Sequence, residues 1–105
     1  MNDVIDYREE GFMLPISRDK VFSYACVNAE MYNVGNELAA TGVYFTYLLH
    51  PVKGSCRFTI EQEIGTGNWY SKDAPAFVEH DIILEIGTAI NAKRERRNML
   101  TPKQL

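Results

Sequence analysis

Hydrophobic and polar residues in the first part of the chain predict two short strands followed by a long helix. Residues 4–7 and 12–14 are short apolar pieces, and the polar run between them is typical of a turn. Over residues 18–41, polar side chains recur at helical spacing, and Ser17 occupies the position of an N-cap. We therefore expect an amphipathic helix over 18–41. Small residues on its apolar side would let it lie close to a sheet.

The pattern in the middle of the chain predicts an antiparallel hairpin. Residues 43–49 form an aromatic and β-branched run of strand length, and residues 50–55 have the composition of a turn. The following run, 56–64, alternates in a period of two. On this spacing Cys56, Phe58, Ile60 and Ile64 face one way, and Arg57, Thr59, Glu61 and Glu63 face the other.

The last third of the chain admits two interpretations after a loop at 65–75. Residues 76–86 alternate as a strand would, but they also share a face at helical spacing. We favour a helix over 74–98, because Asp73 suits an N-cap, acidic residues come early and basic residues come late. Gly87 counts against this helix, since an interior glycine costs about 1 kcal/mol relative to alanine.

These elements predict a single α+β domain over residues 1–105, with the order ββαββα. An antiparallel sheet would pack one face against the helix at 18–41 and against the C-terminal helix. The alternative is a ferredoxin-like βαββαβ domain, in which residues 78–86 form the last strand. Tyr44 and Tyr47 fall on opposite faces of their strand, so a sheet face left uncovered would need a partner to cover it.

Composition and cysteine content favour a soluble protein of the cytoplasm. Apolar residues make up 46% of the chain and charged residues 24%, which excludes a disordered chain. The first residues are acidic and do not resemble a secretory signal, and no uncharged run reaches the ~20 residues of a membrane helix. Two cysteines without a metal-binding spacing indicate free thiols in a reducing compartment.

Charge divides the chain into an acidic body and a basic tail. Residues 1–92 carry six basic against thirteen acidic residues, whereas residues 93–105 carry five basic against one acidic. The tail cations Lys93, Arg94, Arg96 and Arg97 predict a contact with an acidic surface, such as that of a second copy. Nucleic acid is a less favoured partner, because phosphate binding needs a positive face rather than one patch on an acidic body.

Candidate chemistry is sparse. Gly65-Thr66-Gly67 follows a predicted strand, but the third glycine of a dinucleotide-binding loop is absent, so these glycines are assigned to turns. The run Glu79-His80-Asp81 does not form a local catalytic unit, because consecutive side chains diverge on a helix and alternate on a strand. Cysteines and histidines show no metal-ligand spacing, and we expect neither a metal nor a cofactor.

Two aromatic residues in the polar loop at 65–75 are the strongest candidates for a binding surface. Trp69, the single tryptophan, and Tyr70 lie in a glycine-flanked loop, where they either form a binding surface or fold back over the core.

We therefore expect a small binding or adaptor protein, homodimeric and without catalysis of its own. The alternative is a compact enzyme or small-ligand binder whose pocket lies under the 65–75 loop, with Trp69, Tyr70 and His80 at its mouth. Nucleic-acid binding through the basic tail is the third hypothesis.

Overall fold

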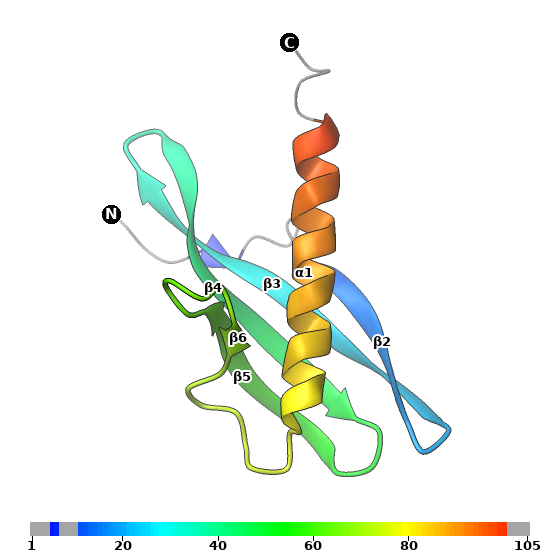
Figure 1. Ribbon diagram of the computed structural model, residues 1–105. Coiled ribbons are helices and arrows are strands. Elements are labelled where there is room, and N and C mark those ends of the chain that lie inside the picture. Colours follow the sequence, from blue (N-terminus) through cyan, green and yellow to red (C-terminus); the bar gives the residue numbers. More distant parts are fainter. Residues whose placement is uncertain (1–4, 7–10, 101–105) are drawn as a thin grey trace.

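The computed structural model describes residues 5–6 and 11–100 as a curved antiparallel sheet followed by one long helix (Figure 1). The elements are β1 (Ile5–Asp6), β2 (Phe12–Arg18), β3 (Val21–Val34), β4 (Glu37–His50), β5 (Gly54–Gln62), β6 (Trp69–Tyr70) and α1 (His80–Leu100). The order in space is β1-β3-β4-β5-β6, and β2 also pairs with β3.

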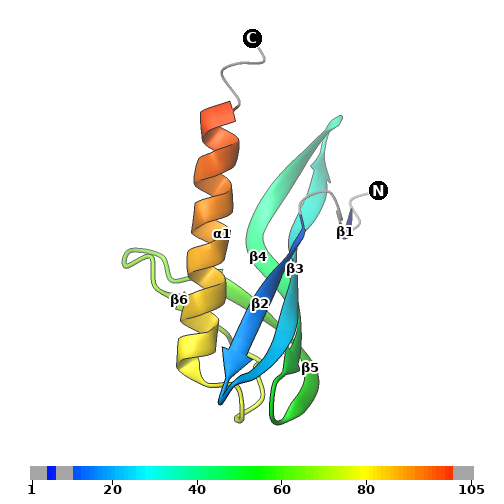
Figure 2. The same cartoon turned by 90° about the vertical axis from the view of Figure 1, so that its right-hand side faces the viewer.

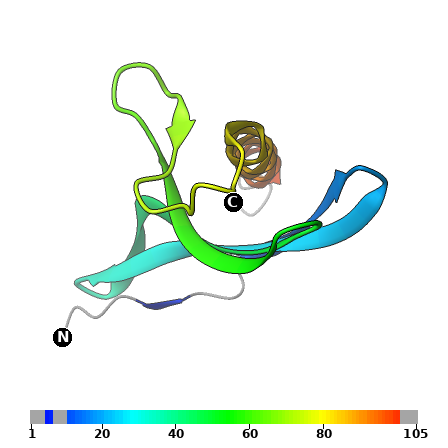
Figure 3. The same ribbon diagram turned by 90° about the horizontal axis from the view of Figure 1, so that it is seen from below.

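Helix α1 lies over the concave side of the sheet, and the core fills the space between them (Figure 3). Ile82, Ile86 and Ile90 of the helix are buried. They belong to the same cluster as Val27, Leu48 and other inward side chains of the strands. No element among the described residues lies over the convex side, which we call the outer face (Figure 2).

The helix predicted over 18–41 is wrong. This segment forms the last residue of β2, all of β3 and the first part of β4, and a turn at Gly35-Asn36 joins β3 to β4. Strand β3 is apolar on both sides, because small residues from Ser23 to Ala29 face the core while Phe22 and Tyr24 face outward. Apolar and polar residues therefore do not alternate along β3, and its few polar residues happen to recur at helical spacing.

Two tight turns in this region carried a signal that the helical interpretation missed. Arg18 pairs with Val21, so Asp19 and Lys20 form a two-residue hairpin loop, and both have positive φ, 53° and 66°. That conformation is the type I′ geometry that matches the twist of antiparallel strands. Ser17 is consequently a strand residue and not a helix cap.

The second turn, Gly35-Asn36, also closes a hairpin with two residues, between the paired Val34 and Glu37, but here Gly35 alone has positive φ. Gly35 has φ of 64°, which suits glycine. Gly-Asn between two apolar runs is a known hairpin signature, and it is the feature that could have revealed the strands. The order ββαββα and the ferredoxin-like alternative are both overturned by these hairpins.

The other predictions about elements fare better. The β4–β5 hairpin is confirmed, with Phe58 and Ile60 buried and Arg57 exposed on the opposite face. The predicted position of Ile64 on the apolar side is wrong, because β5 ends at Gln62 and Ile64 is 99% exposed in the loop that follows. The C-terminal helix also forms, but it begins at His80 rather than near residue 74. Residues 74–79 instead make a turn in which Val78 N–H donates to the Pro75 carbonyl at 3.0 Å. The strand alternative for 78–86 is wrong.

Candidate functional site

The outer face of the sheet exposes large apolar side chains from three adjacent strands. Met13 of β2 is 59% exposed, Phe22 and Tyr24 of β3 are 79% and 54% exposed, and Leu49 and Tyr47 of β4 are 46% and 41% exposed. Strand register places Met13 beside Cys26 and Cys26 beside Tyr47, so these side chains belong to one continuous surface. We call the part formed by Met13, Phe22, Tyr24 and Leu49 the apolar patch.

A hollow of about 530 Å³ lies beside the apolar patch on the same face. Its walls include Asn28, Phe45, Tyr47, Arg57, Thr59 and Asp73. The Arg57 guanidinium lies 5.6 Å from the centre of the Tyr47 ring, which orients its charge over the hollow. No carboxylate among residues 11–95 forms an ion pair with Arg57.

Asp73 closes one end of this hollow by bonding to the edge of β5. Its Oδ1 accepts from the Thr59 backbone N–H at 2.9 Å, and from the hydroxyls of Thr59 and Ser71, each at 3.2 Å. The hydrogen bond from the Thr59 backbone is the main reason that the pKa of Asp73 is lowered. The carboxylate predicted to cap a helix therefore caps a strand edge.

Trp69 is buried against α1 and is not exposed on its loop. Only 5% of its surface is exposed, and its indole lies against Gly87 of α1 and edge-on to Tyr44, with ring centres 5.9 Å apart. Of the two predicted positions for Trp69, the one in which it folds back over the core is therefore the one observed. Its Nε1 is buried, and none of the described residues forms a hydrogen bond with it.

Tyr70 and His80 nevertheless border a second hollow with the edge of Trp69. This hollow measures about 390 Å³ and is also lined by Glu63, Asn68 and Leu84. Tyr70 donates its hydroxyl to Glu61 at 3.1 Å. His80, the first residue of α1, is exposed. The three residues predicted at a pocket mouth are thus adjacent, although Trp69 contributes little accessible surface.

The basic tail is turned partly toward the body. Arg94 Nε donates to the Tyr44 hydroxyl at 3.0 Å and Nη1 donates to Gln62 Oε1 at 3.1 Å, and its guanidinium lies 5.5 Å from the Trp69 ring centre. Lys93 lies 5.5 Å over the Phe12 ring. Neither cation is neutralised by a carboxylate in these contacts. The side chains of Arg96 and Arg97, and residues 101–105, lie outside the described part of the chain.

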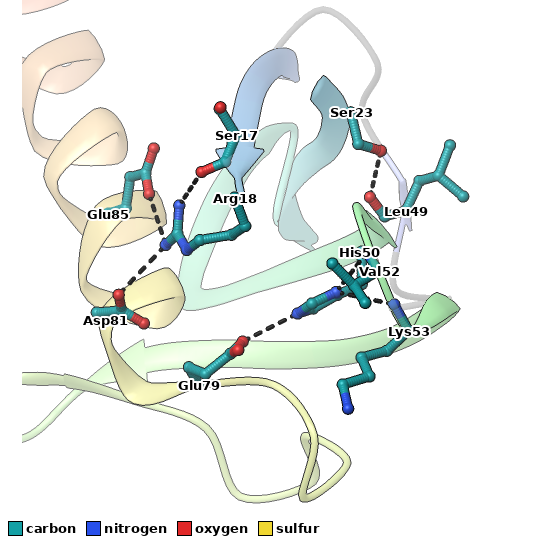
Figure 4. Close-up of polar contacts among 10 residues, drawn as sticks. All are labelled: Ser17, Arg18, Ser23, Leu49, His50, Val52, Lys53, Glu79, Asp81 and Glu85. Atoms are coloured by element: carbon teal, nitrogen blue, oxygen red, sulfur yellow. Dashed lines mark hydrogen bonds and ion pairs between the residues drawn. The ribbon is translucent and has the colours of Figure 1, made fainter. Parts of the chain in front are cut away.

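The acidic residues at the start of α1 hold the helix against the sheet (Figure 4). His50 accepts from the backbone N–H groups of Val52 and Lys53 at its Nδ1, both at 3.1 Å. A neutral imidazole therefore carries its proton on Nε2, which donates to Glu79 Oε1 at 2.9 Å. This hydrogen bond is the main reason that the pKa of Glu79 is lowered.

A second contact, from Arg18, links the end of β2 to the same helix. Its guanidinium lies 3.1 Å from a Glu85 oxygen and 3.5 Å from an Asp81 oxygen. Sequence spacing gave no indication of the His50–Glu79 pair or the Arg18 contacts, because their partners are 29 or more residues apart.

The two cysteines are candidate metal ligands together with the other titratable side chains of the described residues. Cys26 and Cys56 are both free. They lie on opposite faces of the sheet, since Cys26 pairs with Tyr47 and Cys56 with the neighbouring Leu48. In the part of the chain that the structure describes, no group of three or more His, Cys, Asp or Glu side chains is positioned to hold a metal ion.

Comparisons with known proteins give no family and no relative for this chain. No family model, no curated protein and no solved structure matches it. Across residues 5–6 and 11–100, no helix combines the length and the apolar character needed to cross a lipid bilayer.

Proposed function

We propose that this protein is a small binding protein, without a reaction of its own, that forms a homodimer through the apolar patch. The observation that carries the proposal is the exposure of four large apolar side chains on one uncovered sheet face. Phe22, at 79% exposed, contributes nothing to the fold's own core. Contiguous apolar surface of this kind marks interaction sites in soluble proteins.

A second copy suits the patch because apolar surface is complementary to itself. Met13, Phe22, Tyr24 and Leu49 carry no charge, so a two-fold axis through them brings no like charges together. Two such sheets can stack face to face about 10 Å apart, as in a sandwich. The cytoplasm, where free thiols persist, is the compartment that this proposal assumes.

The size of the face indicates how tightly two copies would bind. Along β3 the apolar patch extends from Phe22 to Cys26, which lies beside Met13, over roughly 13 Å, and β2 to β4 spans roughly 10 Å at normal strand spacing. Their product, roughly 130 Å² before side chains are counted, lies well below the ~800 Å² per partner of a standard interface. We therefore expect a dimer that dissociates in the micromolar range.

Light scattering after size exclusion, run from low to high micromolar concentration, tests the proposal. The expected result is a rise from the monomer mass of 12.0 kDa toward twice that value. Phe22→Glu should keep the protein monomeric at every concentration. Ile64→Glu is the matched control, because Ile64 is 99% exposed on a loop outside the patch. A wild-type protein that stays monomeric throughout would refute the homodimer.

The hollow bordered by Tyr70 and His80 supports a second candidate, a small-ligand binding site. Its volume of about 390 Å³ falls in the range of known ligand pockets, and a carboxylate, an amide and an imidazole surround it. A thermal-shift screen of metabolites, repeated on His80→Ala, tests this candidate. It requires at least one compound that stabilises the wild type and not the variant.

A further inference from the structure

We propose that the free edge of β5, together with the hollow beside it, binds an extended segment of another protein that carries an acidic side chain. This site lies at the β5 edge of the outer face and borders the apolar patch where Ser55 pairs with Leu49. The proposal adds a second partner to the homodimer and does not depend on it.

The edge of β5 is only partly paired. Strand β6 pairs with β5 at Glu61 and Gln62 alone, whereas β4 pairs with β5 along residues 54–60. The Thr59 N–H donates to Asp73, on the side away from β4. Because backbone groups alternate in direction along a strand, the N–H and carbonyl groups of Arg57 and Ser55 point to the same open side.

Asp73 indicates what this edge accepts. Its carboxylate oxygen occupies the place on the Thr59 N–H that a carbonyl of an added strand would take. The edge is thus filled by β6 at residues 61–62, by a side-chain oxygen at residue 59, and by no described residue at 57 and 55. An incoming strand can extend the sheet from the point where Asp73 leaves it.

Arg57 supplies the charge that selects the incoming strand. The residue is exposed, its guanidinium is held over the Tyr47 ring, and no ion pair with the carboxylates of residues 11–95 engages it. A carboxylate on the incoming strand can form charge-assisted hydrogen bonds with it. The adjoining hollow of about 530 Å³, with Phe45 and Tyr47 in its walls, accommodates a neighbouring side chain.

The same arginine argues against a second copy at this edge. Antiparallel pairing of two β5 edges around a two-fold axis would bring the two Arg57 side chains close together, and like charges opposite each other destabilise a strand pair. The edge of β2 is also a poor partner, because Pro15 lacks the backbone N–H that a ladder needs. The occupant is therefore a segment of a different, acidic partner.

A display selection of random heptapeptides on the immobilised full chain tests the proposal. Selected peptides should be enriched in Asp or Glu at one position between β-forming residues. The best peptide, synthesised with a fluorophore, should bind Arg57→Gln at least about tenfold more weakly than wild type. Lys53→Gln is the matched control, since it removes the same charge from the neighbouring turn and should change binding less than twofold.

Two further measurements separate strand addition from simple charge attraction. Methylation of alternate backbone nitrogens in the peptide should abolish binding, because the bonds to β5 are main-chain bonds. Amide resonances of Ser55 and Arg57 should shift when the peptide is added, and Phe22→Glu should bind it like the wild type. Selection without acidic enrichment, equal binding by Arg57→Gln, or tolerance of methylation would each overturn the proposal.

Discussion

Replacing Gly87 with alanine should destabilise the protein, although alanine is the better helix former. A Cβ built on Gly87 would lie 2.2 Å from Trp69 Cγ, 2.3 Å from Cδ1 and 2.6 Å from Cδ2. Carbon atoms in contact normally lie about 3.5–4.0 Å apart, so the ring or the helix would have to move by more than about 1 Å. The indole is buried and cannot swing into solvent.

The magnitude follows from two opposing terms. Alanine gains about 1 kcal/mol over glycine in a helix interior. Overpacking a well-filled core costs about 1–3 kcal/mol, and contact with a rigid ring belongs at the upper end of that range. We expect a net loss of about 1–2 kcal/mol, which lowers the melting temperature of a domain of this size by roughly 5–10 °C.

Urea and thermal unfolding, followed by far-UV circular dichroism, measure this loss. Thr88→Ala is the matched control, because Thr88 is the exposed neighbour of Gly87 on the same helix and alanine there should be neutral or stabilising. Combining Gly87→Ala with Trp69→Leu should recover part of the penalty, since the smaller side chain makes room. If Gly87→Ala alone raises the melting temperature, the close packing of Trp69 on the helix is refuted.

Three other predictions follow from the polar contacts. Arg94→Met should lower the free energy of unfolding, measured by urea titration, by about 1–2 kcal/mol. Arg94→Lys should lower it by a similar amount, because lysine cannot make both hydrogen bonds and the contact with the Trp69 ring. Asp73 has a lowered pKa, so its stabilisation is full above the unfolded-state pKa and is lost as pH falls through the lower folded value. Asp73→Asn should therefore flatten the acid side of the stability–pH curve, and a wild-type slope in the variant would contradict the bond to Thr59. His50→Ala removes the acceptor for two turn N–H groups and the partner of Glu79, and should cost about 2 kcal/mol in thermal unfolding.

A strand could be predicted from the sequence only where its two faces differ in polarity. Strand β5 has a buried apolar side and a polar side, so its alternation was visible and the prediction was correct. Strand β3 carries alanine, valine and serine inside but phenylalanine and tyrosine outside, so hydrophobicity alone could not reveal its two faces. The exposed aromatic residues that make β3 part of a candidate binding surface are therefore the same residues that hid its strand pattern.

Helix propensity and capping patterns also failed where a residue distant in sequence determines the local structure. Gly87 counted against a helix because propensity records only the backbone, whereas the indole of Trp69, eighteen positions earlier in sequence, is what makes a side chain there unfavourable. The helix begins at His80 because Val78 enters the core and His50 holds Glu79, and neither contact follows from the residues around Asp73.

The sequence alone determined the properties that depend on neighbouring residues: the central hairpin, the C-terminal helix, the separation of Tyr44 from Tyr47 and the acidic body with its basic end. Tertiary structure decided which surfaces remain open. The burial of Trp69 and the inward turn of Arg94 arise from contacts between α1 and strands that are distant in sequence. Packing of α1 on one side of the sheet also leaves the outer face uncovered, and no local pattern contains that choice of side.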